Sequence, residues 1–272
     1  MDLTKADRRA VVTGSASGIG QATTRLLRSQ GWEVIGADLR DADIAVDLSD
    51  PQLRQDAVDL ILQRYATGVD AIIACAGISR QNDPAVISTN YFGTTRFLAG
   101  LRQLLVSSSC PRAVVVSSFA AVMATDPAIL DACLDDDESE ALAASRRAIE
   151  ADRTTNVIYA SSKLALAEWV RREAVLQEWA GAGILLNAVA PGTVRTPMMQ
   201  ATLEDPVKAA ALLTRVPCPL NRYPEAEEIA RLLIFLGSEE NNFIVGQTIF
   251  IDGGAEASVR RNRAYPVDAY TH

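Results

Sequence analysis

Short apolar runs alternate along the chain with longer stretches in which apolar residues recur at helical spacing. Leu53, Ala57, Leu60 and Ile61 show this spacing, which predicts an amphipathic helix. A helix of about a dozen residues is what a crossover between parallel strands requires. The alternation therefore predicts a doubly wound, three-layer α/β/α sandwich around a parallel sheet. The predicted strands are residues 10–12, 33–37, 71–74, 113–116, 184–189 and 248–251.

The chain shows no sign of division into separate units. Its 272 residues are 49% hydrophobic, which is enough for one large core. No internal repeat or linker-like segment interrupts them, so we expect a single domain over residues 1–272. Two segments depart from the alternation: an insertion at 119–157, with an acidic cluster at 135–140, and a tail at 255–272. We expect the cluster to be a solvated helix start and the tail to be a frayed terminus.

Charge and residue usage exclude several classes of function. A net charge of −8 disfavours nucleic acid and anionic membranes as partners, so we expect a small-molecule ligand. The sole histidine, His272, leaves no Ser/His/Asp or Cys/His centre, and we expect no metal site. The scattered cysteines form no CxxC pair and are expected to be free thiols. Residues 1–9 are polar and lack the apolar core of a secretory signal, which predicts a cytoplasmic protein.

A glycine-rich segment directly follows the first predicted strand and opens a helical stretch. It reads TGSASGIG at residues 13–20. Glycines at such a junction let the backbone approach a pyrophosphate, and the free N–H groups of a helix start favour the anion. Asp38 ends the second predicted strand, eighteen residues beyond Gly20, where its carboxylate can accept ribose hydroxyls. Together the two features predict a dinucleotide site.

Tyr159 and Lys163 are four positions apart in a predicted helix, so their side chains share one face. A phenol with a pKa of about 10 is a poor base at neutral pH, but a neighbouring ammonium and an oxidised nicotinamide both favour the phenolate. The oxidation of an alcohol requires such a base. The spacing alone also fits an ordinary exposed Tyr/Lys pair.

The order of these motifs resembles that of the short-chain dehydrogenase/reductase family. The resemblance covers residues 10–254 and implies a Rossmann fold, a nicotinamide cofactor and a tyrosine-based mechanism. The matching motifs are TGSASGIG at 13–20, Asp38, Cys75-Ala76-Gly77, Asn90, Ser118, YASSK at 159–163 and Pro191-Gly192.

The resemblance implies a role for each matching residue. Tyr159 would be the acid–base, Lys163 would lower its pKa and bind the nicotinamide ribose, and Ser118 would hydrogen-bond the substrate oxygen. Asn90 would hold a water that links Lys163 to solvent. The implied cofactor-binding residues are Gly14, Ser17, Gly18, Ile19, Gly20, Asp38, Leu39, Asp47, Leu48, Cys75, Ala76, Gly77, Tyr159, Lys163, Pro191, Gly192, Val194 and Thr196.

Within this set, the resemblance assigns Asp47 and Leu48 to adenine, and Val194 and Thr196 to the nicotinamide amide. The chain also departs from the family pattern. Where the family usually has Asn-Asn-Ala-Gly, residues 74–77 read ACAG, so a side-chain contribution to that turn is missing. The catalytic Ser and Tyr are 41 positions apart, far more than is usual, and the insertion at 119–157 accounts for the difference.

The insertion and the segments at 38–42, 87–93 and 251–254 resemble more specifically the bacterial 3α-hydroxysteroid dehydrogenase/carbonyl reductase subgroup. This implies NAD(H) and reversible oxidation of a hydroxyl on a steroid or another bulky apolar alcohol. NAD is expected over NADP because Asp38 would repel a 2′-phosphate and neither Ser15 nor Leu39 is basic, although Arg40 could reach the phosphate. Terpenoid or aryl alcohols remain open as substrates. A non-catalytic NAD-binding sensor also remains open, although such proteins normally lose the Tyr or the Lys.

The segments after Ser118 and Thr196 are expected to wall the substrate pocket. They are mostly apolar and would favour a bulky apolar alcohol, or they could simply pack the insertion onto the core. A homo-dimer or homo-tetramer is expected, because members of the family commonly pair through the helices following Val86 and Tyr159. The insertion could block the second surface and leave a dimer through the C-terminal strand and helix. The predicted wall residues are Val122, Met123, Pro197, Met198, Met199 and Leu203.

Overall fold

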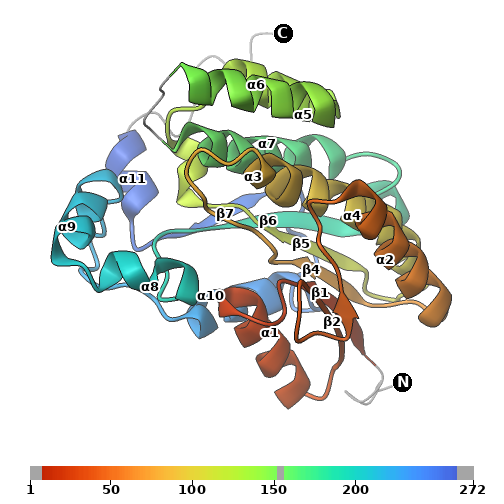
Figure 1. The fold of residues 1–272 in the computed structure, drawn as a ribbon. Helices are drawn as coiled ribbons and strands as arrows, with labels where there is room; N and C mark the ends of the chain where they lie inside the picture. Colours follow the sequence, from red (N-terminus) through yellow and green to blue (C-terminus); the bar gives the residue numbers. More distant parts are fainter. Residues whose placement is uncertain (1–7, 152–155, 262–272) are drawn as a thin grey trace, which may run out of the picture.

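The computed structural model describes residues 8–151 and 156–261, and a seven-stranded parallel sheet lies at its centre. The strand order is β3-β2-β1-β4-β5-β6-β7 (Figure 1). This confirms the predicted doubly wound sheet. β3 is the one strand that the pattern did not predict, because two residues are too few to show a periodicity. The strands are β1 (Arg9–Thr13), β2 (Glu33–Asp38), β3 (Ile44–Ala45), β4 (Ala71–Ala74), β5 (Arg112–Val116), β6 (Leu185–Pro191) and β7 (Thr248–Ile251).

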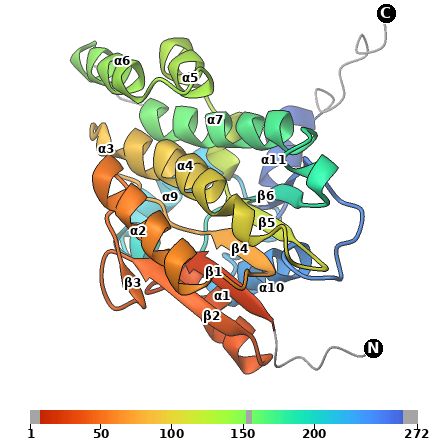
Figure 2. The same cartoon turned by 90° about the vertical axis from the view of Figure 1, so that its right-hand side faces the viewer.

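Helices cover both faces of the sheet, as Figures 1 and 2 show. One face carries α1 (Gly18–Ser29) and α10 (Ala226–Leu236), which pack against each other. The other face carries α2 (Pro51–Arg64), α4 (Gly93–Leu101) and α7 (Val157–Glu173). The remaining helical segments are α3 (Ala85–Ile87), a π-helical turn (Ser88–Phe92), 3-10 turns (Arg102–Leu104, Phe119–Val122 and Ala180–Ala182), α5 (Pro127–Leu134), α6 (Glu138–Glu150), α8 (Pro197–Leu203), α9 (Pro206–Arg215) and α11 (Ala255–Arg260).

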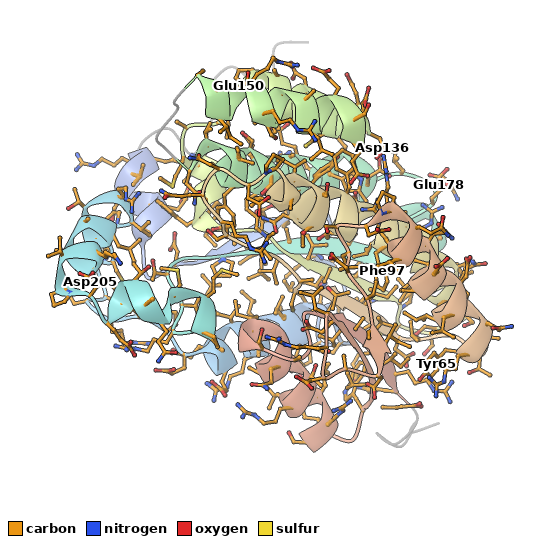
Figure 3. All side chains as sticks on the ribbon, viewed as in Figure 1. Tyr65, Phe97, Asp136, Glu150, Glu178 and Asp205 are labelled. Carbon is orange, nitrogen blue, oxygen red and sulfur yellow. The ribbon has the colours of Figure 1, made fainter. Side chains whose placement is uncertain are left out.

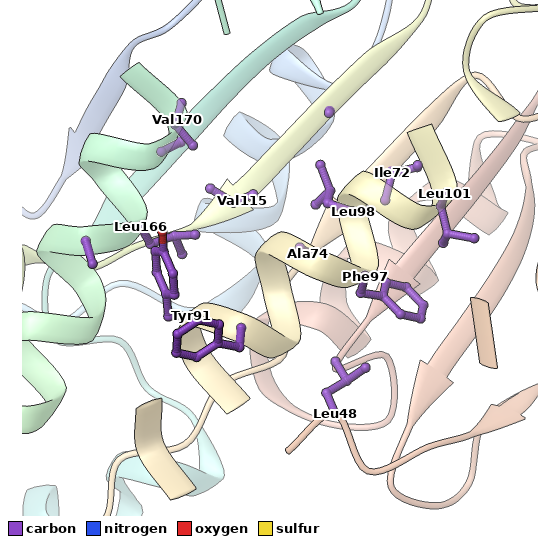
Figure 4. Packing of buried hydrophobic residues seen from close by; sticks show 14 of the residues in the cluster. Leu48, Ile72, Ala74, Tyr91, Phe97, Leu98, Leu101, Val115, Leu166 and Val170 are labelled. Atoms are coloured by element: carbon purple, nitrogen blue, oxygen red, sulfur yellow. The ribbon is translucent and has the colours of Figure 1, made fainter. Parts of the chain in front are cut away.

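The core consists of two apolar layers, one on each side of the sheet. Successive strand side chains point to opposite faces. Val11 and Ile72 therefore belong to the layer under α2, α4 and α7, whereas Val12 and Ile73 belong to the layer under α1 and α10. Figure 4 shows the first layer, where Ile72 lies in the same cluster as Leu101 of α4. Burying each such side chain contributes about 2 kcal/mol, so both helical layers are held by apolar contact.

The order of the strands reverses at β1, because β2 and β3 lie on one side of it and β4 to β7 on the other. In sheets of this kind, ligands bind outside the carboxyl ends of the strands next to the reversal. The carboxyl ends of β1, β2 and β4, with the loops that follow them, carry the glycine-rich segment, Asp38 and residues 75–77. The topology thus brings three motifs that are distant in sequence to one edge of the sheet.

The insertion at 119–157 contains two helices outside α7. α5 packs on α7, and α6 packs on α5 (Figure 1). The side chain of Asp137 caps α6 by accepting a hydrogen bond from the Glu140 N–H at 2.9 Å, which confirms the predicted helix start in the acidic cluster. The predicted solvation of the cluster is wrong for Glu138. Its side chain is only 12% exposed, because two arginines bind it.

The predicted tail begins with a helix, α11, instead of fraying from residue 255. Asp252 holds the start of this helix, since its carboxylate accepts from the Gly254 N–H at 2.9 Å and the Glu256 N–H at 2.6 Å. Residues 1–7, 152–155 and 262–272, with the rest of the predicted tail and His272, lie outside the described residues. Within the described ranges, no helix has both the length and the apolar character needed to cross a membrane.

Candidate active site

A cavity of about 590 Å³ opens at the carboxyl ends of the central strands. Every residue that the sequence predicts to bind a cofactor, from Gly14 to Thr196, lines this cavity. Ser118, Tyr159 and Lys163 line it as well. Among the predicted catalytic and cofactor-binding residues, Asn90 alone is absent from its wall. The motifs that are scattered through the sequence therefore meet at a single site.

The glycine-rich turn brings the start of α1 to the floor of the cavity. Gly14 has a φ of +68°, and a Cβ there would lie 2.8 Å from the Ala76 nitrogen, so only glycine fits. No side chain caps the first amides of α1 at Ser17, and Gly18, Ile19 and Gly20 line the cavity. Free amides and the positive end of the helix dipole thus face the space in which a pyrophosphate would lie.

Asp38 lies at the end of β2 with its carboxylate fixed by two backbone amides. One oxygen accepts a hydrogen bond from the Ala16 N–H at 2.9 Å, and the other accepts from the Leu39 N–H at 2.7 Å. A carboxylate has about four acceptor positions, so capacity remains for ligand hydroxyls. The charged side chains that residues 38–49 contribute to the lining are those of Asp38 and Asp47, both acidic, and Arg40 does not line the cavity.

Residues 75–77 close the cavity at the end of β4. The Ala76 N–H donates to the Thr13 hydroxyl at 3.1 Å, which joins this turn to β1. Burial raises the pKa of the Cys75 thiol to about 12, although a hydrogen bond with Thr23 acts in the opposite direction. Cys75 is therefore a protonated thiol at neutral pH and not a nucleophile.

Tyr159, Lys163 and Ser118 meet where α7 passes the end of β5. The Lys163 side chain is 4% exposed, and its Nζ donates to the Val116 carbonyl at 2.8 Å. The same Nζ lies 5.8 Å from the centroid of the Tyr159 ring. Ser117 donates from its hydroxyl to the Lys163 carbonyl at 2.8 Å and so fastens α7 to β5. The predicted Tyr/Lys pair is not an exposed surface pair.

Burial sets the electrostatics of this group. It raises the pKa of the Tyr159 phenol, and a hydrogen bond with Ser118 acts against the rise. It also lowers the pKa of Lys163 to about 8, with the Cys75 thiol acting in the opposite direction. Both groups are therefore sensitive to any charge that enters the cavity, as is typical of functional sites.

Asn90 is buried behind the cavity wall. Its Oδ1 accepts from the Ile78 N–H at 2.8 Å, and its Nδ2 donates to the Ile78 carbonyl at 3.0 Å and the Ser162 hydroxyl at 3.2 Å. A Cβ on Gly77 would lie 3.2 Å from Asn90 Oδ1 and 3.4 Å from Lys163 Nζ, so the two side chains flank this glycine. The sequence predicted an ordinary helix here, whereas Asn90 lies in a π-helical turn, a feature frequent at functional sites.

Four of the six residues predicted to wall the substrate pocket line the cavity. Val122 and Leu203 do not line the cavity, because side chains adjacent in a helical turn point about 100° apart and their neighbours Met123 and Thr202 face it. α9 was not predicted from the sequence, although its Asp205-Pro206 start is a recognisable helix signal. The wall residues that were predicted are Met123, Pro197, Met198 and Met199, and those missed include Phe119, Ala120, Thr202, Leu212, Arg215 and Val216.

Comparison with known proteins decides the family. Residues 14–256 match a family model described as enoyl-(acyl carrier protein) reductase. The 3-alpha-hydroxysteroid dehydrogenase/carbonyl reductase of Comamonas testosteroni is 37% identical over 255 residues, which span 92% of this chain and 97% of that protein. The chain belongs to the short-chain dehydrogenase/reductase family. It is therefore an oxidoreductase, and its resemblance to the 3α-hydroxysteroid dehydrogenase/carbonyl reductase subgroup is confirmed.

Two further proteins are similar to this chain over nearly its whole length. The structure of the 3-alpha-hydroxysteroid dehydrogenase from Pseudomonas sp. B-0831 complexed with NADH is 38% identical, with a TM-score of 0.83, and the match covers 93% of this chain and 99% of that one. The cis-4-hydroxycyclohexanecarboxylate dehydrogenase of Sinomonas cyclohexanicum is 30% identical, over 93% of this chain and 98% of that protein. The Rossmann fold predicted from the motifs is confirmed.

Proposed function

We propose that this protein is an NAD(H)-dependent oxidoreductase that interconverts a bulky apolar secondary alcohol and its ketone. One observation carries the proposal: Tyr159, Lys163 and Ser118 line the same cavity as the uncapped start of α1 and the Asp38 carboxylate. The first three residues supply acid–base chemistry at an alcohol, and the other two features supply a dinucleotide site.

The residues present fit a nicotinamide dinucleotide. The start of α1 suits the pyrophosphate, Asp38 suits the adenosine ribose, and the walls at Asp47, Leu48, Val194 and Thr196 suit the adenine and nicotinamide ends. The absence of a basic lining residue between 38 and 49 favours NAD over NADP. When bound, the nicotinamide supplies the hydride chemistry, as acceptor from the carbinol carbon or as donor to the ketone.

The chain's own residues handle the proton. In alcohol oxidation, the Tyr159 phenolate takes the hydroxyl proton while the Ser118 hydroxyl donates a hydrogen bond to the substrate oxygen. The Lys163 ammonium favours the phenolate and binds the nicotinamide ribose. Asn90 would hold the water that links Lys163 to solvent, and its side chain is fixed by its hydrogen bonds with Ile78 and Ser162.

The substrate is proposed to be bulky and apolar because of the walls around it. Met123, Met198, Met199 and Leu212 line the side of the cavity formed by the 3-10 turn and by α8 and α9. A bulky apolar alcohol gains about 25 cal/mol for each Å² buried there, and the methionines adapt to several shapes. The two hydroxysteroid dehydrogenases among its relatives support a steroid. The hydroxycyclohexanecarboxylate dehydrogenase favours, as a second candidate, a non-steroidal cyclic alcohol.

The test is NADH production by the purified protein over a graded series of alcohols. The series runs from a short-chain secondary alcohol through cyclic terpenoid and aryl alcohols to a 3-hydroxysteroid. The proposal requires kcat/KM to rise with apolar bulk. A flat series, or a preference for sugars or hydroxy acids, contradicts the proposed substrate class, and the absence of turnover alongside tight NADH binding would favour a sensor.

We further propose that residues 1–272 act as one domain in the cytoplasm and form a homo-dimer. The four free cysteines support a reducing compartment. The insertion covers α7, and this leaves the face formed by α10 and the edge strand β7 as the pairing surface. Phe243, in the loop between these two elements, is 90% exposed and suits such a surface.

A further inference from the structure

One carboxylate at the start of α6 binds arginines on two helices of the Rossmann core. Glu138 Oε2, at the start of α6, accepts from Arg54 Nη2 on α2 at 3.0 Å and from Arg96 Nη1 on α4 at 2.7 Å. Arg96 also donates to the carboxylate of Asp136 at 3.1 Å and to its carbonyl at 2.9 Å. Figure 3 shows Asp136 at the end of the insertion that lies nearest α4. Arginines on two helices of the core thus bind the start of α6.

Arg54 links Glu138 to the wall of the cavity. Its Nη1 donates to the Leu48 carbonyl at 3.2 Å. Leu48 and Asp47 both line the cavity, in the segment assigned above to the adenine. The Leu48 carbonyl also lies close to α4, since a Cβ on Gly93 would lie 2.9 Å from its oxygen. Figure 4 shows Leu48 on the α4 side of the core, near Phe97.

The Arg54–Glu138 pair is unlike the other ion pairs between described residues. Its side chains are 4% and 12% exposed, whereas every other such pair has at least one side chain that is 36% or more exposed. A buried ion pair contributes little net stability, because desolvation offsets the attraction, and its best-attested use is to fix one arrangement of the chain. Here its arginine also binds the Leu48 carbonyl, so the pair joins the backbone at residue 48 to α6 through α2.

We propose that Glu138 and Arg54 are positioning residues for the adenosine half of the cofactor site, so that the two-helix insertion serves nucleotide binding. This proposal rests on the cofactor site proposed above. Without the Glu138 carboxylate, the Arg54 guanidinium is buried without a counter-charge and turns toward water. The Leu48 carbonyl then loses its donor, and the adenine-facing segment loses its fixed position. The nicotinamide half, held by other elements, is unaffected.

The test compares ligand fragments on Glu138→Gln. Dissociation constants are measured by titration calorimetry or NMR for NADH, for ADP-ribose and for nicotinamide mononucleotide. We expect the constants for NADH and ADP-ribose to rise about tenfold, the loss of one hydrogen bond to a charged group. The constant for nicotinamide mononucleotide, and kcat at saturating cofactor, should stay within twofold. Arg54→Met should give the same pattern, and the double variant no larger loss, because both changes break one path.

A matched control lies on the same helix. Glu140→Gln removes an exposed carboxylate of α6 that pairs with Arg147, and it should leave all three dissociation constants unchanged. The proposal is wrong if Glu138→Gln binds ADP-ribose with wild-type affinity. It is also wrong if the affinity for nicotinamide mononucleotide falls as much as that for ADP-ribose, because an equal loss indicates a merely structural role. Failure of the wild-type protein to bind NADH or ADP-ribose contradicts the proposed function instead.

A measurement on the wild-type protein covers the case in which Glu138→Gln does not fold. Coupling is reciprocal, so a ligand that needs the start of α6 in place must in turn stabilise it. ADP-ribose should therefore slow hydrogen–deuterium exchange of the amides at 138–141 as well as those at 47–49, and nicotinamide mononucleotide should do neither. Protection confined to 47–49 overturns the proposal.

Discussion

Lys163 combines an ionisable amine with almost complete burial. Its pKa falls from the ordinary 10.5 to about 8, because burial disfavours the charged form. In the unfolded chain the amine keeps its ordinary value, so between about pH 8 and pH 10.5 the unfolded chain binds more protons than the folded one. At pH values below 8, the buried amine therefore reduces the free energy of unfolding by its full amount. This reduction becomes smaller as the pH rises from about 8 to 10.5.

Lys163→Met should remove this destabilisation by the buried amine, and the effect can be measured in the cofactor-free protein. The unfolding free energy of the variant minus that of wild type should be largest near pH 7 and should fall by about 1.4 kcal/mol per pH unit above pH 8. Loss of the bond to the Val116 carbonyl shifts the difference by an amount that does not depend on pH. Urea unfolding from pH 7 to 9.5 measures it, with the exposed Lys208→Met as control. A flat difference for Lys163→Met contradicts the burial argument.

Asp38 should decide the choice of cofactor. Two unit charges about 4 Å apart at an effective dielectric of about 20 repel by roughly 4 kcal/mol, and partial exposure reduces this. We expect kcat/KM for NAD to exceed that for NADP by on the order of a hundredfold, and Asp38→Asn to narrow the gap to about tenfold or less. Initial rates at subsaturating concentrations of each cofactor measure both ratios. Comparable values for the wild-type protein would show that Asp38 does not discriminate.

Single side chains were predictable from the sequence where a local motif carries their chemistry. Asp38 and the Tyr159/Lys163 pair belong to short segments whose spacing already implies a shared site, and the structure places them at one cavity. Glu138 was not predictable in this way. It looks like one more acid in a solvated run, and its partners lie 84 and 42 positions away in the sequence. Burial by distant residues leaves no local pattern.

At the scale of elements, periodicity determined what could be predicted. Strands four or more residues long repeat an apolar pattern and were predicted within a residue or two, as for 184–189 against Leu185–Pro191. The apolar spacing at 53–61 predicted the crossover helix α2 but not its bounds. α5 and α9 were missed, although each starts with an Asp-Pro pair that caps a helix. The π-helical turn at Ser88–Phe92 was not predictable from local sequence, because Asn90 within it binds Ser162, which is 72 positions away.

The helix α8 should act as an apolar wall for large substrates. Met198→Glu places a charge on that wall, which a bulky apolar alcohol would have to desolvate. We expect kcat/KM to fall about tenfold or more for a 3-hydroxysteroid or terpenoid alcohol, and less than about twofold for a short-chain secondary alcohol. Val207→Glu, on the exposed surface of α9, is the control. An equal loss for both substrate sizes would place the specificity elsewhere.

At the scale of the whole molecule, the sheet of the described residues has two edge strands, β3 and β7, and β7 pairs only with β6. If the face of β7 and α10 is the pairing surface, Phe243→Asp should convert a dimer into a monomer, since it places a charge at the centre of an apolar contact. Sedimentation velocity at micromolar concentration measures the result. Val175→Asp, at an exposed position after α7, should stay dimeric. A monomeric wild-type protein, or dissociation by the second change alone, contradicts this interface.

The central claim is that Tyr159 is the acid–base of an NAD-dependent alcohol oxidoreductase, and Tyr159→Phe tests it most directly. NADH binding, followed by fluorescence, should remain within about twofold of wild type, because the change removes one hydroxyl and leaves the dinucleotide site intact. Turnover of the best alcohol should fall by about 10² to 10⁴. Retention of near-normal turnover by a folded, NADH-binding Tyr159→Phe protein would contradict the claim.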